Sequence, residues 1–209
     1  MELLFLLIIG LGTGLSGTMI PGPLFLFTVS ESLKKGPTVG LRIALGHVFI
    51  EAAFVALIFL GFKNLLSSQI FMRIVTTIGG VAMIAMGILL VRTAKDMHLT
   101  VDRQVNFGYG SIAGGAFFSI ISPGFLIWWT TIGLSVILQS LLFGVAGFAA
   151  VALGHWLADF GWHWFVSDFV HKGKIYLKDR HYHNAIRFLA FGLIAMGCYF
   201  LVINHGLSR

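Results

Sequence analysis

The chain alternates long apolar stretches with short polar connections. A helix needs roughly 20 apolar residues to cross the hydrocarbon core of a bilayer, and six stretches reach that length. They are residues 3–30, 39–62, 69–92, 110–138, 141–166 and 184–204. Two longer connections, residues 93–109 and 167–183, carry most of the charge outside the stretches. The pattern predicts an all-α, polytopic membrane protein with six transmembrane helices.

The composition excludes an ordinary soluble protein. Of the 209 residues, 57% are hydrophobic and 11% are charged, whereas soluble domains carry about 25% charged residues. A β-barrel is not expected either, because its strands are about 10 residues long and alternate in polarity. The N-terminus has neither a basic segment nor a small-residue cleavage site. We therefore expect the first stretch to be retained as a helix.

The basic residues indicate an orientation. If the N-terminus lies outside, the inner connections hold 11 of the 14 Lys and Arg residues, and the outer side holds Lys63, Arg73 and Arg209. The positive-inside rule then predicts a multi-pass protein of the cell membrane with both termini extracytoplasmic. The net charge of +6 follows from these connections, so we expect the lipid bilayer and no nucleic acid as a partner.

Three short sequences occur twice, and in the same order. Ala-Leu-Gly-His stands at residues 44–47 and 152–155, and Ile-Ala-Met-Gly stands at residues 84–87 and 194–197. A Pro-Gly pair stands in the first and in the fourth stretch. An ordered set of repeats indicates an internal duplication.

The duplication predicts two three-helix repeats, residues 1–100 and 101–209, which together form one membrane domain. Because three is odd, the second repeat enters the membrane from the opposite side. Inverted repeats of this kind are typical of secondary transporters, which bind their cargo near the middle of the membrane where the repeats meet.

Proline interrupts the first and the fourth stretch. Proline lacks a backbone N–H and clashes with the preceding turn, so each helix should break there. Broken backbone inside a membrane must be covered by protein or line a polar cavity, and the amides at a helix N-terminus suit a carboxylate. The prolines could alternatively be simple packing kinks. We expect a substrate site at the two breaks, formed by Pro21, Gly22, Pro23, Ser122, Pro123 and Gly124.

Two acids, Glu51 and Asp159, lie deep inside the predicted spans. A carboxylate at mid-bilayer costs about 2.5–3.5 kcal/mol, which favours a functional reason for keeping it. His47 and His155 each precede an acid by four residues and therefore share its helix face. Such a pair can take up or release a proton near neutral pH, so we expect these four residues to couple transport to an ion.

The same atoms could instead bind a metal. Imidazole and carboxylate together suit a transition-metal dication such as zinc, nickel or manganese. On this reading the ligands would be His47, Glu51, His155, Asp159 and His163. The sequence contains no nucleotide-binding loop and no recognisable arrangement of catalytic nucleophile and base, so we expect neither an enzyme nor a cofactor.

The chain resembles the LysE/RhtB amino-acid exporters over essentially its whole length, in size, helix count and motif order. The resemblance rests on Pro21-Gly22-Pro23, Leu33-Lys34-Lys35-Gly36, Gly40, Gly46 and Glu51, and continues at Ser122-Pro123. It implies a carrier that expels amino acids or related small zwitterions, driven by a proton or sodium gradient. Leu24, Ser122 and Gly124 stand where the family has Asn, Asn and Lys.

The wider superfamily that this resemblance indicates also contains exporters of heavy metals and manganese. Divalent-metal export is therefore the alternative to amino-acid export. The glycine-rich first stretch is also compatible with close helix contacts and with a homodimer.

Overall fold

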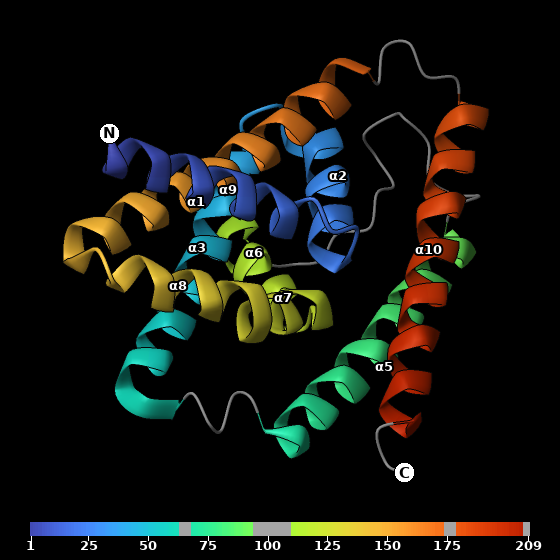
Figure 1. Ribbon diagram of the computed structural model, residues 1–209. Coiled ribbons are helices and arrows are strands. Elements are labelled where there is room, and N and C mark those ends of the chain that lie inside the picture. Colours follow the sequence, from blue (N-terminus) through green and yellow to red (C-terminus); the bar gives the residue numbers. More distant parts are fainter. Residues whose placement is uncertain (63–67, 94–109, 174–178, 207–209) are drawn as a thin grey trace.

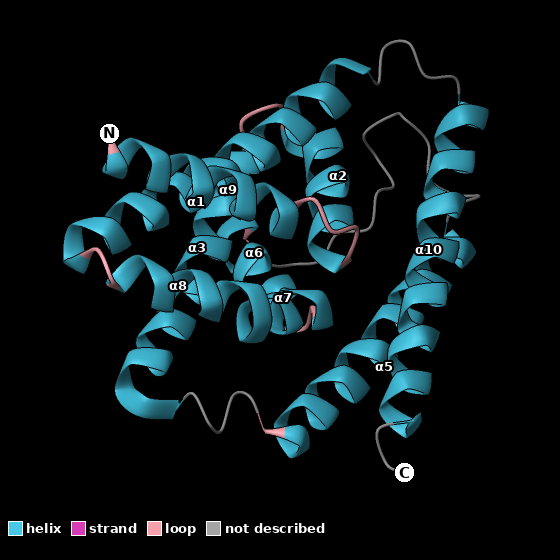
Figure 2. Ribbon diagram, in the orientation of Figure 1, coloured by secondary structure: helices cyan, strands magenta, loops and turns pink. Residues whose placement is uncertain are grey.

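The computed structural model describes residues 1–62, 68–93, 110–173 and 179–206, and all regular elements in these ranges are helices (Figure 1, Figure 2). In chain order they are α1 (Glu2–Thr18), α2 (Pro23–Lys35), α3 (Val39–Leu57), the π-helical η1 (Ile58–Phe62), α5 (Gln69–Thr93), α6 (Ser111–Ile120), α7 (Pro123–Trp128), the π-helical η3 (Trp129–Gly133), α8 (Leu134–Leu141), α9 (Gly144–Gly173) and α10 (Asp179–Gly206). The all-α prediction is confirmed for the described part of the chain.

The helices break at both proline sites. The first predicted span is divided into α1 and α2, which are bent by 84° with respect to each other. Gly22 has an extended backbone and Pro23 opens α2, where its missing N–H leaves no hydrogen bond unmade. In the fourth predicted span, α6 ends at Ile120 and Pro123 opens α7 after the extended Ser122.

Among the described residues, Val39–Gly61 and Pro123–Leu141 are long and apolar enough to cross a bilayer, and the bent pair of α1 with Pro23–Leu33 qualifies if counted together. The six-span prediction therefore stays a prediction.

The expectation of a long polar connection at residues 167–183 was wrong at both ends, because α9 continues to Gly173 and α10 begins at Asp179.

Glycines at the repeated Ala-Leu-Gly-His sequences form tight helix crossings. Gly154 of α9 lies against the backbone of α1 at Leu7 and Leu11, so a Cβ there would overlap the facing main chain. Gly46 of α3 lies in the same way against α6, at Ile112. Each repeated glycine thus packs its helix against the first, proline-broken helix of the other half (Figure 1).

The second repeated sequence behaves in the same way. Gly87 of α5 packs against Ala190 and Ile194 of α10, and Gly197 of α10 packs against Gly80 and Ile84 of α5. These two helices lie side by side as a pair (Figure 1). Within the predicted close-contact helix α1, Gly10 and Gly14 meet α9, whereas Gly12 has open space beside it. The crossings formed by the repeated glycines Gly46, Gly87, Gly154 and Gly197 each join one half of the chain to the other.

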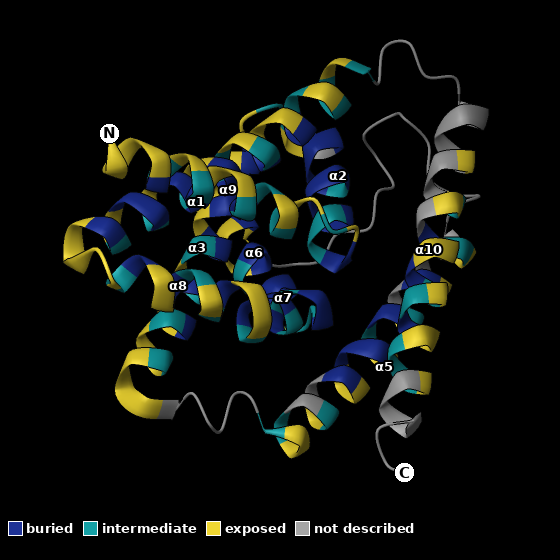
Figure 3. Cartoon of the chain, in the orientation of Figure 1, coloured by how far each residue is buried: buried dark blue, intermediate teal, exposed yellow. Residues whose placement is uncertain are grey.

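Many large apolar side chains are exposed, and several polar and charged side chains are buried. Figure 3 shows where the buried and exposed positions lie along the helices. Phe49, Leu157 and Phe169 are more than half exposed, whereas Glu51 and Asp159 are 2% and 1% exposed. A protein in water shows the opposite distribution, because it buries apolar groups and solvates charges. The arrangement suits a surface that faces lipid around a polar interior.

Candidate functional site

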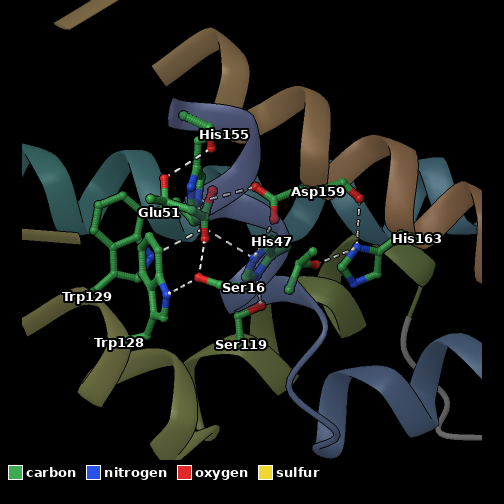
Figure 4. A network of polar contacts seen from close by, with 12 residues as sticks. Ser16, His47, Glu51, Ser119, Trp128, Trp129, His155, Asp159 and His163 are labelled. Carbon is green, nitrogen blue, oxygen red and sulfur yellow. Dashed lines mark hydrogen bonds and ion pairs between the residues drawn. The ribbon is translucent and has the colours of Figure 1, made fainter. Parts of the chain in front are cut away.

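Glu51 of α3 and Asp159 of α9 lie where these two helices pack against each other, and each is preceded by a histidine one turn earlier (Figure 4). His47 Nε2 lies 3.2 Å from Glu51 Oε1 on the same helix. His155 Nε2 lies 3.0 Å from the same oxygen although it belongs to α9. The structure therefore brings together all four residues that the sequence proposes for ion coupling, and one carboxylate oxygen is shared by histidines from both halves.

Asp159 lacks direct hydrogen-bond partners at the same place. His47 Nε2 is 3.8 Å from its Oδ1, and His155 Nε2 is 3.6 Å from its Oδ2. Within the described residues, both of these oxygens and Glu51 Oε2 are buried without a hydrogen-bond partner. Buried carboxylate oxygens of this kind require a proton, a cation or a donor group, because leaving them unpaired is costly. These three oxygens are therefore available to a proton, a cation or a hydrogen-bond donor.

Ser119 of α6 forms a hydrogen bond with His47 and orients its ring. The Ser119 hydroxyl lies 2.7 Å from the carbonyl of Gly115 and 2.7 Å from His47 Nδ1. When the hydroxyl donates to the carbonyl, it accepts from His47 Nδ1, which then carries a proton. His47 Nε2 is left to face the two carboxylates (Figure 4). It either donates a second proton to them or offers a lone pair to a shared proton or metal ion.

Two tryptophans enclose the cluster on one side. Trp129 Nε1 donates to Glu51 Oε1 at 3.3 Å, and Trp128 Nε1 donates to the hydroxyl of Ser16 at 3.2 Å. The imidazole of His155 lies against both indoles, with ring centroids 5.0 Å from Trp128 and 5.3 Å from Trp129. The sequence leaves open whether these tryptophans are interfacial anchors, and the structure makes them walls of the site.

His163 lies one turn beyond Asp159 on α9, and its ring forms a hydrogen bond with the main chain instead of with a carboxylate. Its Nδ1 donates to the backbone carbonyl of Asp159 at 2.9 Å, and its ring centroid is 5.7 Å from that of His47. Among the described residues, the group with ligand atoms within 4.8 Å of one another consists of His47, Glu51 and Asp159. His163 borders this potential metal site without belonging to that group.

A cavity of about 40 Å³ lies between these side chains. One buried water needs roughly 10–15 Å³ by this measure, so the cavity holds about three waters. Gly22 and Ser122 line it, and the hydroxyl of Ser122 is 3.7 Å from where a Cβ on Gly22 would stand. The two helix breaks therefore meet at the cavity that contains the acids.

The other predicted break residues lie behind this lining. Pro23, Pro123 and Gly124 are buried and outside the cavity wall, and Pro21 is exposed. These residues shape the breaks, whereas Gly22 and Ser122 face the cavity.

A further buried acid was not anticipated from the sequence. Glu31 of α2 is 2% exposed, forms an ion pair with Lys35, and accepts a hydrogen bond from Ser111 of α6 at 3.2 Å. On the same helix, Ser32 donates to Ser167 of α9 at 2.9 Å. Glu31 stands just beyond the predicted end of the first span, at residue 30, so it was not counted among the acids inside the spans. Its four-residue spacing from Lys35 was the available signal.

The sequence model of the LysE type translocator family matches residues 15–204. No curated protein and no solved structure gives a significant match to the chain. The matched range contains both helix breaks and all members of the buried cluster.

Proposed function

The chain belongs to the family of LysE type translocators, and we propose that it is a secondary transporter that exports amino acids or related small zwitterions in exchange for protons. Membership of the family makes it a membrane transporter. The cargo, the direction of transport and the coupling ion are our proposals. The observation that carries them is the buried cluster of His47, Glu51, His155 and Asp159, to which both halves of the chain contribute equally.

The cluster can bind either a proton or the ammonium group of a zwitterion. Glu51 Oε2 and both oxygens of Asp159 have no partner within the described residues, and they lie beside the cavity. A proton or an ammonium group would each satisfy them, but the two cannot occupy the same oxygens together. Competition of this kind is the simplest way to exchange one for the other across a membrane.

The broken first helix offers a place for the other end of the cargo. Leu24 and Phe25 follow Pro23 in the first turn of α2, where backbone N–H groups have no partner within the helix. Both residues line the cavity. The N-terminal end of a helix attracts negative charge, so a carboxylate fits there while the ammonium group lies at the acids.

The pattern of helix packing supports an alternating-access mechanism. Exchanging the two halves of the chain converts the contact of α1 with α9 into the contact of α6 with α3, and leaves the pair of α5 and α10 unchanged. An inverted repeat predicts this correspondence. Two pseudo-equivalent halves that exchange conformations would open the same central cavity first to one side and then to the other.

The cavity in this structure is small for an amino acid. About 40 Å³ accommodates a few waters, and a zwitterion has at least five non-hydrogen atoms. The cavity as it stands therefore lacks the room for a whole amino acid. Binding of cargo would require α2 or the tryptophans to move.

Transport by purified protein in proteoliposomes tests the proposal. We expect amino-acid efflux to be accompanied by proton entry, and Glu51→Gln and Asp159→Asn each to abolish both. Asp168→Asn is the matched control, because Asp168 lies on the same helix as Asp159 but pairs with Lys172 outside the cavity. If Glu51→Gln and Asp159→Asn leave proton-coupled efflux intact, the coupling role is wrong.

Divalent-metal export is a second candidate, and one observation favours it. His47 Nε2 and the carboxylate oxygens of Glu51 and Asp159 already lie within 4.8 Å of one another, and zinc needs ligand atoms roughly 3.3 Å apart at bonds of about 2.0 Å. Transport assays in the same proteoliposomes distinguish metal export from amino-acid export. Metal export predicts that zinc, nickel or manganese efflux, and not amino-acid efflux, is lost in His47→Ala.

A further inference from the structure

A second cavity adjoins the buried cluster and has a different character. It lies between α3, α8 and α9 and has a volume of about 310 Å³. Trp128, Trp129 and His155 line both cavities, so these three side chains form the partition between them. Beyond the partition the walls are almost entirely apolar, with Val55, Ile137 and Val151 among the lining residues.

The size and the chemistry of the second cavity suit an apolar side chain. An apolar cavity of about 150 Å³ in a protein binds benzene, so one of about 310 Å³ admits an aromatic or branched aliphatic group. The volume also falls in the range of about 300–1,000 Å³ that small-molecule sites occupy. A charged or strongly polar group would lose its hydration there without finding partners.

We propose that the second cavity is the side-chain pocket of the cargo site, and that the exported zwitterion is an amino acid with a bulky apolar side chain. This inference rests on the proposed function. The charged ends of the amino acid would lie at Glu51, Asp159 and the start of α2, while its side chain passes the partition. The occupant is chosen by continuity, because the side chains of Trp128, Trp129 and His155 line both this pocket and the cavity of the ion-binding cluster.

Trp129 is the residue that must move before a side chain can pass from the first cavity into the second. Its indole separates the two cavities and is held by the hydrogen bond from Nε1 to Glu51 Oε1 at 3.3 Å. A cargo ammonium group that binds both oxygens of the Glu51 carboxylate, Oε1 as well as Oε2, competes with this hydrogen bond and releases the indole. Arrival of the charged end would thereby open the route for the apolar end, which makes the pocket selective for molecules that carry both.

Filling the pocket from α3 provides the test. Ala53 and Ala56 are both exposed on the same helix, but Ala56 lines the second cavity whereas Ala53 lines neither cavity. In proteoliposomes we expect the unaltered protein to export leucine and phenylalanine in preference to glycine. Ala56→Phe should lower export of leucine and phenylalanine by about tenfold or more and leave glycine export nearly unchanged. Ala53→Phe should leave all three rates unchanged.

Binding gives an independent readout. Trp128, Trp129 and Trp156 line the second cavity, so leucine should change the tryptophan fluorescence of the purified protein saturably, and Ala56→Phe should remove the change. Equal export of glycine and leucine by the unaltered protein would overturn this inference and leave the proposed function standing. An unaltered preference in Ala56→Phe would also overturn it and would assign the cavity to a lipid chain. Failure to export any amino acid would overturn both proposals.

Discussion

Glu51 is the residue at which the two halves of the molecule meet. Its Oε1 lies within 3.3 Å of nitrogen atoms from His47, His155 and Trp129, while its Oε2 has no partner within the described part of the chain. The four-residue spacing of each histidine and acid could be predicted from the sequence. The pairing across α3 and α9 could not, because periodicity places residues on a helix face but does not say which helix that face meets.

Ser119 is a second residue whose partner in the other half of the chain could not be predicted from the sequence. It flanks the Pro123 break in sequence, yet its function follows from a contact with His47 in a different half of the chain. A serine that donates to a carbonyl four residues earlier is common in membrane helices, so its sequence context contains no sign of the histidine. Such partners are found only when the helices are placed.

At the residue scale we predict that Ser119→Ala slows transport without unfolding the protein. The variant removes the acceptor of the His47 Nδ1 proton, so the imidazole loses the contact that orients Nε2 toward the acids. An unpaired buried donor costs roughly 1–3 kcal/mol, which corresponds to about 5-fold to 150-fold in rate if the cost falls on the transport cycle. Initial efflux rates in proteoliposomes measure this, and Ser119→Thr should restore most of the activity.

Ser140→Ala is the matched control, because Ser140 is equally buried, donates to a carbonyl of its own helix, and lines neither of the two cavities of the site. An equal loss of activity in both serine variants would show that Ser119 has only a packing role.

At the scale of elements, the chain is organised by crossings between its halves. The repeated glycines were visible in the sequence, and their use as close-contact points could be expected. The 84° bend between α1 and α2 could not be quantified, because proline dictates that a helix breaks but neighbouring helices decide its new direction. The extension of α9 to Gly173 was missed because charged and histidine residues in its last turns read as a loop.

The crossing of α9 with α1 gives the prediction at this scale. Gly154→Ala places a Cβ against the backbone of α1, which cannot move aside without shifting the helix. Overpacking of this kind costs roughly 1–3 kcal/mol, so we expect a clearly lower melting temperature in detergent. Gly46→Ala should have a similar effect at the crossing of α3 with α6.

Gly161→Ala is the control on the same helix as Gly154, because a Cβ at Gly161 meets nothing within 4 Å. Alanine favours a helix over glycine by roughly 1 kcal/mol, so this variant should melt at the same or a higher temperature. Equal destabilisation by both substitutions would contradict the tight crossing.

At the scale of the whole molecule, the apolar exterior and the polar centre together specify a membrane transporter, and the family match agrees. The class could be predicted from composition alone, since 11% charged residues cannot cover a globule in water. The number of membrane crossings and the orientation do not follow from composition alone. They depend on connections at residues 63–67, 94–109 and 174–178, which lie outside the described residues and contain Lys63 and much of the counted positive charge.

The orientation can be tested directly, because Cys198 is the only cysteine in the chain. In a Cys198→Ala background, we expect Glu2→Cys and Arg209→Cys to react with a membrane-impermeant maleimide in intact cells, and Lys178→Cys to react only after the membrane is opened. The reason is the excess of Lys and Arg in the connections assigned to the inside. Six crossings place both ends on one face, whereas labelling of only one terminus would require an odd number and would exclude two complete three-helix repeats. Labelling of Lys178→Cys alone in intact cells would preserve the even count but reverse the orientation, and with it the proposed direction of export.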